Sequence, residues 1–295
     1  MPASGRDLVR RAQPWLGTLV EVRVDAAGAA RRQLTTIVDA AFAEIGAIHR
    51  LMSRQERGTD VAAIARAGTG RSVRVDPRTA DVLRVALALY HESGGRYDPD
   101  RSRRRRGALD PAPCGPAWEV SGRDHVRILR RGDLDLDGIA KGFAVDRAVD
   151  ILAGESARGG VNAGGDLRCF GEFTQPLFVR SPLAGGALLC VGRMTAGSFA
   201  TSDSRAEADS GPRPASPGIR DPRPGARPLR RMTVGVAAEQ CIVADALTKV
   251  VAVAPEAASP ILAAYGASAW IVDERQGMPR VRRCGSSAHV QTQAA

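Results

Sequence analysis

One stretch, residues 133–166, constrains the fold of this chain more than any other; it reads DLDLDGIAKGFAVDRAVDILAGESARGGVNAGGD. Two leucines alternate with three aspartates over residues 133–137, which is the period of a half-buried strand, and Gly138 then permits a tight turn. Apolar residues with helical spacing follow over residues 140–152. The chain then turns back through glycines into a second strand that ends in residues 162–166. The pattern predicts a helix between two strands, with a glycine turn on each side of it.

Lys141 lies in the first turn of this predicted helix. The N–H groups of such a turn, the helix dipole and the lysine side chain all favour negative charge, so the arrangement suits a phosphate group. A second interpretation stays open, because neither a P-loop nor a GxGxxG pattern is present. In that interpretation the glycines only let a helix pack closely against a strand, and Lys141 is a solvated surface residue.

Residues 137–146, DGIAKGFAVD, and residues 161–166, VNAGGD, together resemble the paired signature of the ApbE-type flavin transferases, the FAD:protein FMN transferases. The similarity extends from Leu16-Gly17-Thr18 to the strand near Trp270. The resemblance implies an α+β fold that is ApbE-like and related to the T-fold. In such a fold, mixed sheets with packed helices form two interlocked subdomains.

The activity that the resemblance implies is transfer of FMN from FAD to a Thr or Ser hydroxyl of an acceptor flavoprotein, with release of AMP and dependence on magnesium. It assigns catalytic roles to Lys141 and Asp245. It also implies that FAD contacts residues from several parts of the chain, namely Leu16, Ser53, Tyr97, Asp98, Asp137, Lys141, Asn162, Gly164, Gly165, Asp166, Thr201 and Ser202. Two departures concern this set: Leu16 stands where the family usually has methionine, and Asp203 stands where a turn usually has glycine.

The same resemblance implies a magnesium site made by Asp245, the carbonyl group of Ala140 and a threonine four residues after the aspartate. That last position is Lys249 here, while Thr248 lies one place early, about 100° around the helix. An ammonium group repels a cation, and the i, i+4 spacing of Asp245 and Lys249 favours an ion pair. Lys249 therefore either swings away or substitutes for the cation, or it pairs with Asp245 in a site that has lost its metal.

A further departure falls in the segment GIRDPRPG, where Gly218 replaces the histidine with which the family motif begins. The missing imidazole removes the obvious group for handling a proton at the target hydroxyl. Two functions follow from the resemblance: a flavin transferase, or a degenerate paralogue that binds FAD or FMN without transferring it. A third possibility, unrelated to flavin, is an interaction module built on the loop with Arg103–Arg106, although four consecutive arginines are typical of a solvated loop.

The composition excludes other classes. The chain has a net charge of +10, but 4% aromatic residues and no stacking or groove-reading motif argue against nucleic-acid binding. Its five cysteines are scattered and never in CxxC spacing, which argues against a disulfide framework or a zinc site and favours a reducing compartment. No apolar segment resembles a signal peptide or approaches the length of a membrane span. We therefore expect a cytoplasmic protein without a membrane segment.

The resemblance implies one ApbE-like flavin transferase domain over residues 15–283, and we expect a flexible N-terminus at 1–14 and a loose tail at 284–295. Apolar periodicity predicts helices at 30–51, 61–67 and 258–265, a helix that begins at Pro77 with Asp76 as N-cap, and another that begins near residue 243. Alternation predicts strands at 19–24, 167–170, 176–179, 188–191, 232–236 and 267–272, and residues 114–132 read as a hairpin-like region. The resemblance implies a turn at 196–203.

Overall fold

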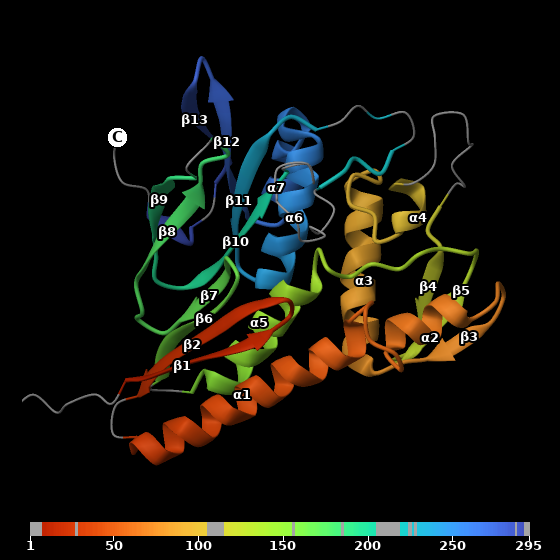
Figure 1. Ribbon diagram of the computed structural model, residues 1–295, viewed down its shortest axis with the longest axis horizontal. Coiled ribbons are helices and arrows are strands. Elements are labelled where there is room, and N and C mark those ends of the chain that lie inside the picture. The colour runs from red at the N-terminus through yellow and green to blue at the C-terminus, as the bar shows by residue number, and fades with distance from the viewer. Residues whose placement is uncertain are drawn as a thin grey trace, which may run out of the picture.

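The computed structural model describes residues 8–26, 29–104, 115–154, 157–183, 186–204, 219–223, 226, 229–286 and 288–291. Its largest element is an eight-stranded antiparallel sheet in the order β1-β2-β6-β7-β10-β11-β12-β13 (Figure 1). The strands of this main sheet are β1 Val9–Trp15, β2 Thr18–Ala26, β6 Ala157–Ala163, β7 Asp166–Phe170, β10 Gly197–Asp203, β11 Met232–Ala238, β12 Ser268–Arg275 and β13 Met278–Gly285.

Three helices cover one face of the main sheet: α1 Arg31–Met52, α5 Ala140–Leu152 and α6 Cys241–Val253 (Figure 1). Helix α1 buries one stripe, which includes Leu34, Val38 and Ile45. Helix α6 is apolar nearly all round and is buried on almost every side, because it lies between the sheet and α5. Such a helix is positioned by its neighbours from all sides.

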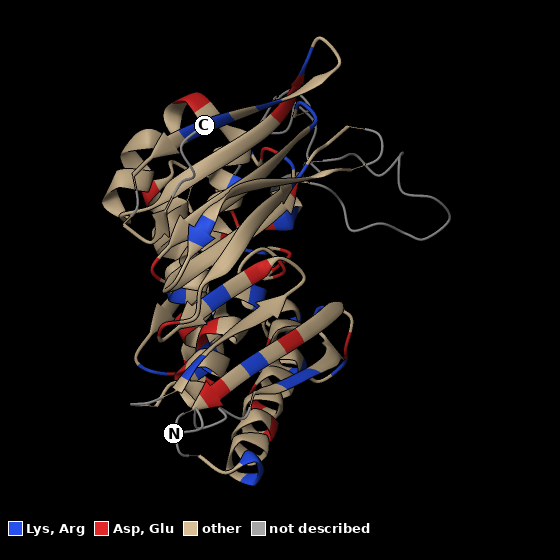
Figure 2. Cartoon of the chain, turned by 90° about the vertical axis from the view of Figure 1, so that its left-hand side faces the viewer, with Lys and Arg blue, Asp and Glu red and all other residues tan. Residues whose placement is uncertain are grey.

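The opposite face of the main sheet is covered by a three-stranded sheet in the order β14-β9-β8. Its strands are β8 Gln175–Arg180, β9 Leu188–Met194 and β14 Val290–Gln291. A second apolar core lies between the two sheets, where Phe199 and Trp270 meet edge to face with ring centroids 5.8 Å apart. Acidic and basic side chains are interspersed along the strands that remain open to solvent (Figure 2), as in the ion pair between Arg10 and Glu21 at 2.6 Å.

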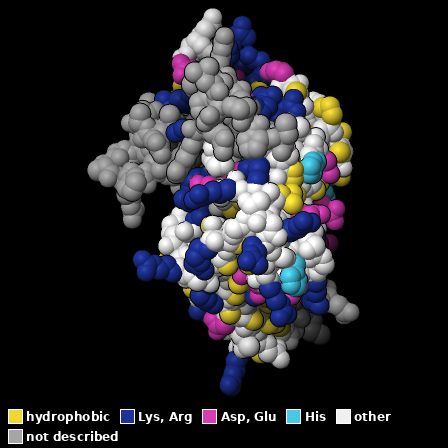
Figure 3. All heavy atoms as spheres, turned by 90° about the vertical axis from the view of Figure 1, so that its right-hand side faces the viewer, with side chains coloured by type: hydrophobic (Ala, Val, Ile, Leu, Met, Phe, Trp, Pro, Cys, Tyr) yellow, Lys and Arg dark blue, Asp and Glu magenta, His cyan; other side chains and the backbone are white. Residues whose placement is uncertain are grey.

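A third sheet, in the order β3-β5-β4, lies at the end of the molecule farthest from β13 (Figure 1). It consists of β3 Ser72–Arg74, β5 His125–Ile128 and β4 Trp118–Ser121, and the nearby helices are α2 Asp60–Arg66, α3 Pro77–Glu92 and α4 Arg101–Arg104. Short helices η2 Pro255–Ala257 and α7 Ser259–Ala264 join α6 to β12. Lys and Arg side chains are spread over this side of the molecule rather than gathered in one stripe (Figure 3).

The α+β class is confirmed, as are α1, α5 and the start of α3, where Asp76 accepts a hydrogen bond from Arg78 N at 2.9 Å. The expected strand at 133–137 is wrong. Leu134 forms only an isolated bridge with Asp100, since this extended segment has no strand beside it to complete a ladder. Its leucines are nevertheless buried, which accounts for the alternation in the sequence.

Three other predictions need correction. Residues 196–203 are not a turn, because Gly197–Asp203 form β10 between β7 and β11. The N-terminus is not loose over 9–14, which pair with β2, and the tail is not loose at Val290–Gln291, which pair with β9. The half-buried face of β1 includes Arg11 and Gln13, and β14 has two residues, so neither strand gives a clear apolar pattern in the sequence. Among the described residues, no helix is both long and apolar enough to cross a bilayer.

Candidate functional site

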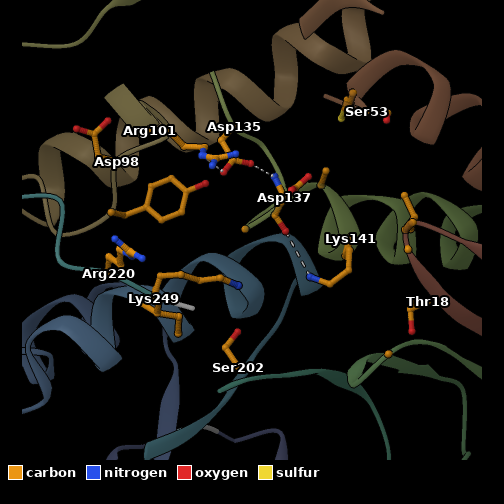
Figure 4. Close-up of a pocket in the computed structure, with 18 of the residues that line it drawn as sticks. Thr18, Ser53, Asp98, Arg101, Asp135, Asp137, Lys141, Ser202, Arg220 and Lys249 are labelled. Atoms are coloured by element: carbon orange, nitrogen blue, oxygen red, sulfur yellow. Dashed lines mark hydrogen bonds and ion pairs between the residues drawn. The ribbon is translucent and has the colours of Figure 1, made fainter. Parts of the chain in front are cut away.

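A cavity of about 730 Å³ lies where the β1–β2 turn, the end of α1, the segment before α5, strand β10 and helix α6 meet (Figure 4). Its size is typical of a small-molecule site. Ten of the residues that the sequence singled out line it: Leu16, Ser53, Tyr97, Asp98, Asp137, Ala140, Lys141, Gly164, Ser202 and Lys249. Gly138 and Gly164, from the two glycine turns, therefore face the same space as Lys141.

Lys141 is held by two buried carboxylates at the back of the cavity. Its Nζ lies 2.9 Å from Asp166 Oδ2 and 3.4 Å from Asp245 Oδ2, and it donates to the main-chain oxygen of Asp137 at 3.4 Å (Figure 4). Asp166 and Asp245 are 1% and 0% exposed and do not line the cavity. Both therefore act on the cavity through Lys141 rather than by direct contact.

The pKa values of this cluster are set by burial and by mutual charge. Burial, together with the neighbouring charge of Asp245, raises the pKa of Asp166 to about 6, although Lys141 opposes the shift. Burial would also raise the pKa of Asp245, but the ammonium groups of Lys141 and Lys249 outweigh it and lower that pKa. Burial lowers the pKa of Lys141, and the two carboxylates reverse this and raise it. Lys141 thus stays a cation at neutral pH.

Helices α5 and α6 meet closely enough to build this cluster because Gly142 has no side chain. A Cβ atom at Gly142 would lie 2.3 Å from the main-chain oxygen of Cys241, and Gly142 N donates to Asp245 Oδ2 at 3.3 Å. One turn later, Asp146 of α5 accepts hydrogen bonds from Cys241 N at 2.9 Å and Ile242 N at 2.8 Å. The motif DGIAKGFAVD therefore fixes the start of α6, and with it Asp245.

Lys249 occupies the place where a metal ligand was expected. Its ammonium group forms an ion pair with Asp245 Oδ1 and donates to the main-chain oxygen of Asp245 at 2.9 Å. Thr248 does not supply the missing ligand. Its hydroxyl is buried, donates a hydrogen bond to the main-chain oxygen of Asp245 at 2.6 Å and forms another with Ser202 Oγ at 2.8 Å. Within the described residues, no group of three or more His, Cys, Asp or Glu side chains is placed to hold a metal. Ala140 and Lys249 line the cavity and Asp245 pairs with Lys249 behind it, so this expected ligand set does not fit a magnesium ion.

The turn between β6 and β7 supports the cavity wall. Gly164 lines the cavity with φ +63°, and a Cβ atom there would lie 2.5 Å from Thr18 Oγ1. Gly165 has φ +107° and lies against Thr201, while Asn162 Oδ1 accepts a hydrogen bond from Gly165 N at 3.0 Å. Asn162, Gly165 and Thr201 do not line the cavity. They shape the turn that does.

The remaining expected contacts come from chain turns. Ser53 ends α1, where its N–H donates to His49 O at 2.9 Å, and Tyr97 N donates to Ser93 Oγ at 3.0 Å. Asp98 Oδ1 accepts from Asp100 N at 2.8 Å. Leu16 lies at the corner between β1 and β2 with φ +56°, in the left-handed region that a leucine rarely adopts.

Several cavity residues were not predicted from the sequence, among them Thr18, Arg96, Arg101, Asp135 and Arg220. Arg101 lies 3.5 Å from Asp135 and Arg220 points into the cavity (Figure 4). Both arginines sit beside Asp-Pro dipeptides, which was the available signal. His49, near the end of α1, also lines the cavity. Gly218, the side chains of Arg103–Arg104 and the rest of the arginine run lie outside the described residues.

Comparison with known proteins gives one family and a set of similar structures. Residues 16–271 match the model of the ApbE family. The structure resembles an ApbE protein from Thermotoga maritima with a TM-score of 0.77 and 25% identity, covering 94% of this chain and 97% of that one. The flavin transferase ApbE from Vibrio cholerae gives a TM-score of 0.74 at 18% identity, covering 96% and 98%. The apo form of the Pseudomonas stutzeri flavinyl transferase ApbE gives 0.75 at 17%, covering 96% of both chains. No curated protein matches the sequence.

Proposed function

The chain belongs to the ApbE family, and on this premise we propose that it transfers FMN from FAD to a Thr or Ser hydroxyl of an acceptor flavoprotein. The observation that supports the proposal most is that Gly138, Lys141 and Gly164, from both signature motifs, line one cavity of about 730 Å³. The solved structures named as flavin transferases, which share the fold, support the same activity.

In this proposal the diphosphate of FAD lies against the N-terminus of α5 and the cations that line the cavity. The first N–H groups of a helix and its dipole favour an anion at that end. Lys249 and Arg220 point into the cavity from the opposite side (Figure 4). Tyr97, which is 4% exposed, offers an apolar surface to the isoalloxazine ring.

The transfer step breaks the phosphoanhydride bond of FAD and forms a phosphoester bond. The target hydroxyl oxygen attacks the phosphorus of FMN, AMP leaves with the bridging oxygen, and the hydroxyl proton passes to solvent. Negative charge that develops on the transferring group is stabilised by Lys141, which we assign as the catalytic cation. Asp245, also expected to be catalytic, is buried behind Lys141 and is a positioning residue.

The alternative is a protein that binds FAD or FMN without transfer. One observation favours it: the ammonium group of Lys249 occupies the position where a metal-binding side chain was expected. The side chains around Asp245 do not fit magnesium, so no step is assigned to it. A cytoplasmic location remains part of the proposal, supported by four free cysteines in the described residues.

Coexpression with Thr- or Ser-containing acceptors, followed by in-gel flavin fluorescence and peptide mass analysis, tests the proposal. Transfer predicts covalent FMN on the acceptor and release of AMP, and Lys141→Ala should lower the rate by about 100-fold or more. FAD binding without label, even with excess Mg²⁺, would leave the binding role. A protein that binds no FAD at all would contradict both.

A further inference from the structure

The chain uses lysine only beside Asp245. Of its 42 Lys and Arg residues, two are lysines, Lys141 and Lys249, and every other basic residue is arginine. Both lysines are ion-paired with the same buried carboxylate, Lys141 with Oδ2 and Lys249 with Oδ1. An ammonium group is a compact point charge, whereas a guanidinium is a wide planar fork. The two positions that avoid arginine are therefore those where a small cation fits between helices α5 and α6.

Lys249 is held in the cavity wall and does not swing into solvent. Its side chain is 17% exposed, and Asp245 takes two of its donors, through Oδ1 and through the main-chain oxygen at 2.9 Å. Its stem lies against the glycine turn, since a Cβ atom at Gly138 would be 3.2 Å from Lys249 Cε. An ammonium group has three N–H donors, so one remains for a ligand in the cavity.

The oxygens that could bind a divalent cation at this point are already engaged. Asp245 Oδ1 faces Lys249, and Asp245 Oδ2 faces Lys141 and Gly142 N. The hydroxyl of Thr248 is turned toward Ser202. The two buried carboxylates at this point, Asp166 and Asp245, are balanced by two ammonium groups. Both lysines would repel a divalent cation added beside Asp245.

We propose that the Lys249 ammonium stands in for a divalent cation, so that this protein binds the diphosphate of a flavin nucleotide without a metal ion. The inference rests on the proposed function, because it names how that ligand is held. Lys249 bridges Asp245 and the phosphate oxygens as a metal ion would. It supplies one positive charge where magnesium supplies two, and Arg220 and Lys141 line the same cavity.

The first experiment measures metal binding without flavin. Titration of Mn²⁺, followed by its electron paramagnetic resonance signal, should show no bound ion at this site in the wild type. The Lys249→Thr variant, which removes the ammonium and adds a hydroxyl ligand, should bind one Mn²⁺. Stoichiometric binding by the wild type that Asp245→Asn abolishes would overturn the proposal. Because no flavin is present, this arm gives a result even if the protein binds no FAD and the proposed function fails.

The second experiment measures FAD affinity by flavin fluorescence in excess EDTA and in excess Mg²⁺. The wild-type Kd should change by less than about threefold between the two conditions. Lys249→Thr should bind about tenfold or more weakly in EDTA and recover in Mg²⁺, whereas Lys249→Met, which keeps the length of the stem, should stay weak in both. Arg66→Met removes an exposed charge on α2 and should bind as the wild type does. A wild-type affinity that rises about tenfold with Mg²⁺, or a Lys249→Met variant that binds normally, would overturn the proposal.

A third measurement uses the scarcity of lysine. In protein labelled with ¹⁵N-lysine, the side-chain ammonium signals come from Lys141 and Lys249 alone. Addition of FAD in EDTA should shift the signal that Lys249→Thr removes. If FAD binds and that signal does not move, Lys249 does not contact the ligand and the proposal is wrong.

Discussion

The N-terminus of α6 is capped by a side chain from another helix, and this makes Asp146 the position to perturb. Asp146 is 7% exposed. Its Oδ1 accepts from Cys241 N at 2.9 Å and Arg168 Nη1 at 2.8 Å, and its Oδ2 accepts from Ile242 N at 2.8 Å. The N-cap residue Gln240 makes no side-chain cap of its own. The first turn of α6 therefore depends on Asp146 for two of its donors.

We expect Asp146→Ala to lower the free energy of unfolding by about 3 kcal/mol, since loss of a cap costs about 0.5–2 kcal/mol and each buried unpaired donor about 1–3 kcal/mol. With an entropy of unfolding near 2.1 cal/mol/K for each residue, this lowers the Tm by roughly 5 °C. Asp146→Asn keeps one oxygen and should lose about half as much. Burial raises the pKa of Asp146, although the hydrogen bonds from Ile242 N and Cys241 N oppose this shift. The ionised carboxylate is therefore costly at this position, which reduces the stability that Asp146→Asn loses.

Urea unfolding followed by circular dichroism measures the free energies, and FAD fluorescence measures the consequence for the cavity. Because α6 carries Asp245 and Lys249, Asp146→Ala should also weaken FAD binding. Asp150→Ala is the matched control on α5: Asp150 makes only looser surface pairs, with Arg147 at 3.4 Å and Arg168 at 3.6 Å, and should change stability by less than about 0.5 kcal/mol. If Asp146→Ala is no more destabilising than Asp150→Ala, the cap does not hold α6 in place.

Two further predictions concern stability. Gly142→Ala should lower the free energy of unfolding in urea by about 1–3 kcal/mol, because the new methyl group would clash with the main chain of α6 and this clash outweighs the helix propensity of alanine. Gly154→Ala is the control, since a Cβ atom there would meet nothing within 4 Å. Equal effects of the two substitutions would contradict the packing argument. Asp100 is fully buried, and although burial raises its pKa, hydrogen bonds from Asp133 N, Ser102 and Arg130 lower it below the ordinary value. The ionised Asp100 therefore stabilises the fold above the unfolded pKa near 3.8, and this stabilisation is lost as the pH falls through the folded pKa. Asp100→Asn should be most destabilising at neutral pH, and the difference in unfolding free energy between wild type and variant should shrink below about pH 4. If urea unfolding gives the same difference at every pH, the charge of Asp100 is unimportant.

Much of the fold could be predicted from the sequence where a local pattern determines structure. The helix at 140–152 has both a stripe and flanking glycines, and Asp76-Pro77 is a complete start signal for α3. Strand β14 could not be predicted, because its order comes from β9, which lies far back in the chain. Strand β1 was missed although it forms a hairpin with the next strand, β2, since its half-buried face includes Arg11 and Gln13. The aspartate alternation at 133–137 indicated one-sided burial correctly and a sheet wrongly.

The candidate site was predictable to a different extent. The signature motifs gave residues that do line one cavity, such as Lys141 and Gly164. The roles of their neighbours depend on depth, which no spacing reports. Asp166 shares a signature motif with the cavity residue Gly164, and Asp245 shares helix α6 with the cavity residue Lys249, yet both aspartates are buried and do not line the cavity. The i, i+4 pairing of Lys249 with Asp245 was foreseen because it is local to one helix.

The left-handed backbone at Leu16 sets two selective pressures against each other. For a residue with a branched side chain this conformation costs on the order of 1–2 kcal/mol, which glycine or asparagine would largely recover. The leucine side chain, however, forms part of the cavity wall. A library screened for thermal stability alone would therefore enrich Leu16→Gly and Leu16→Asn. These more stable variants would bind the proposed flavin nucleotide with lower affinity.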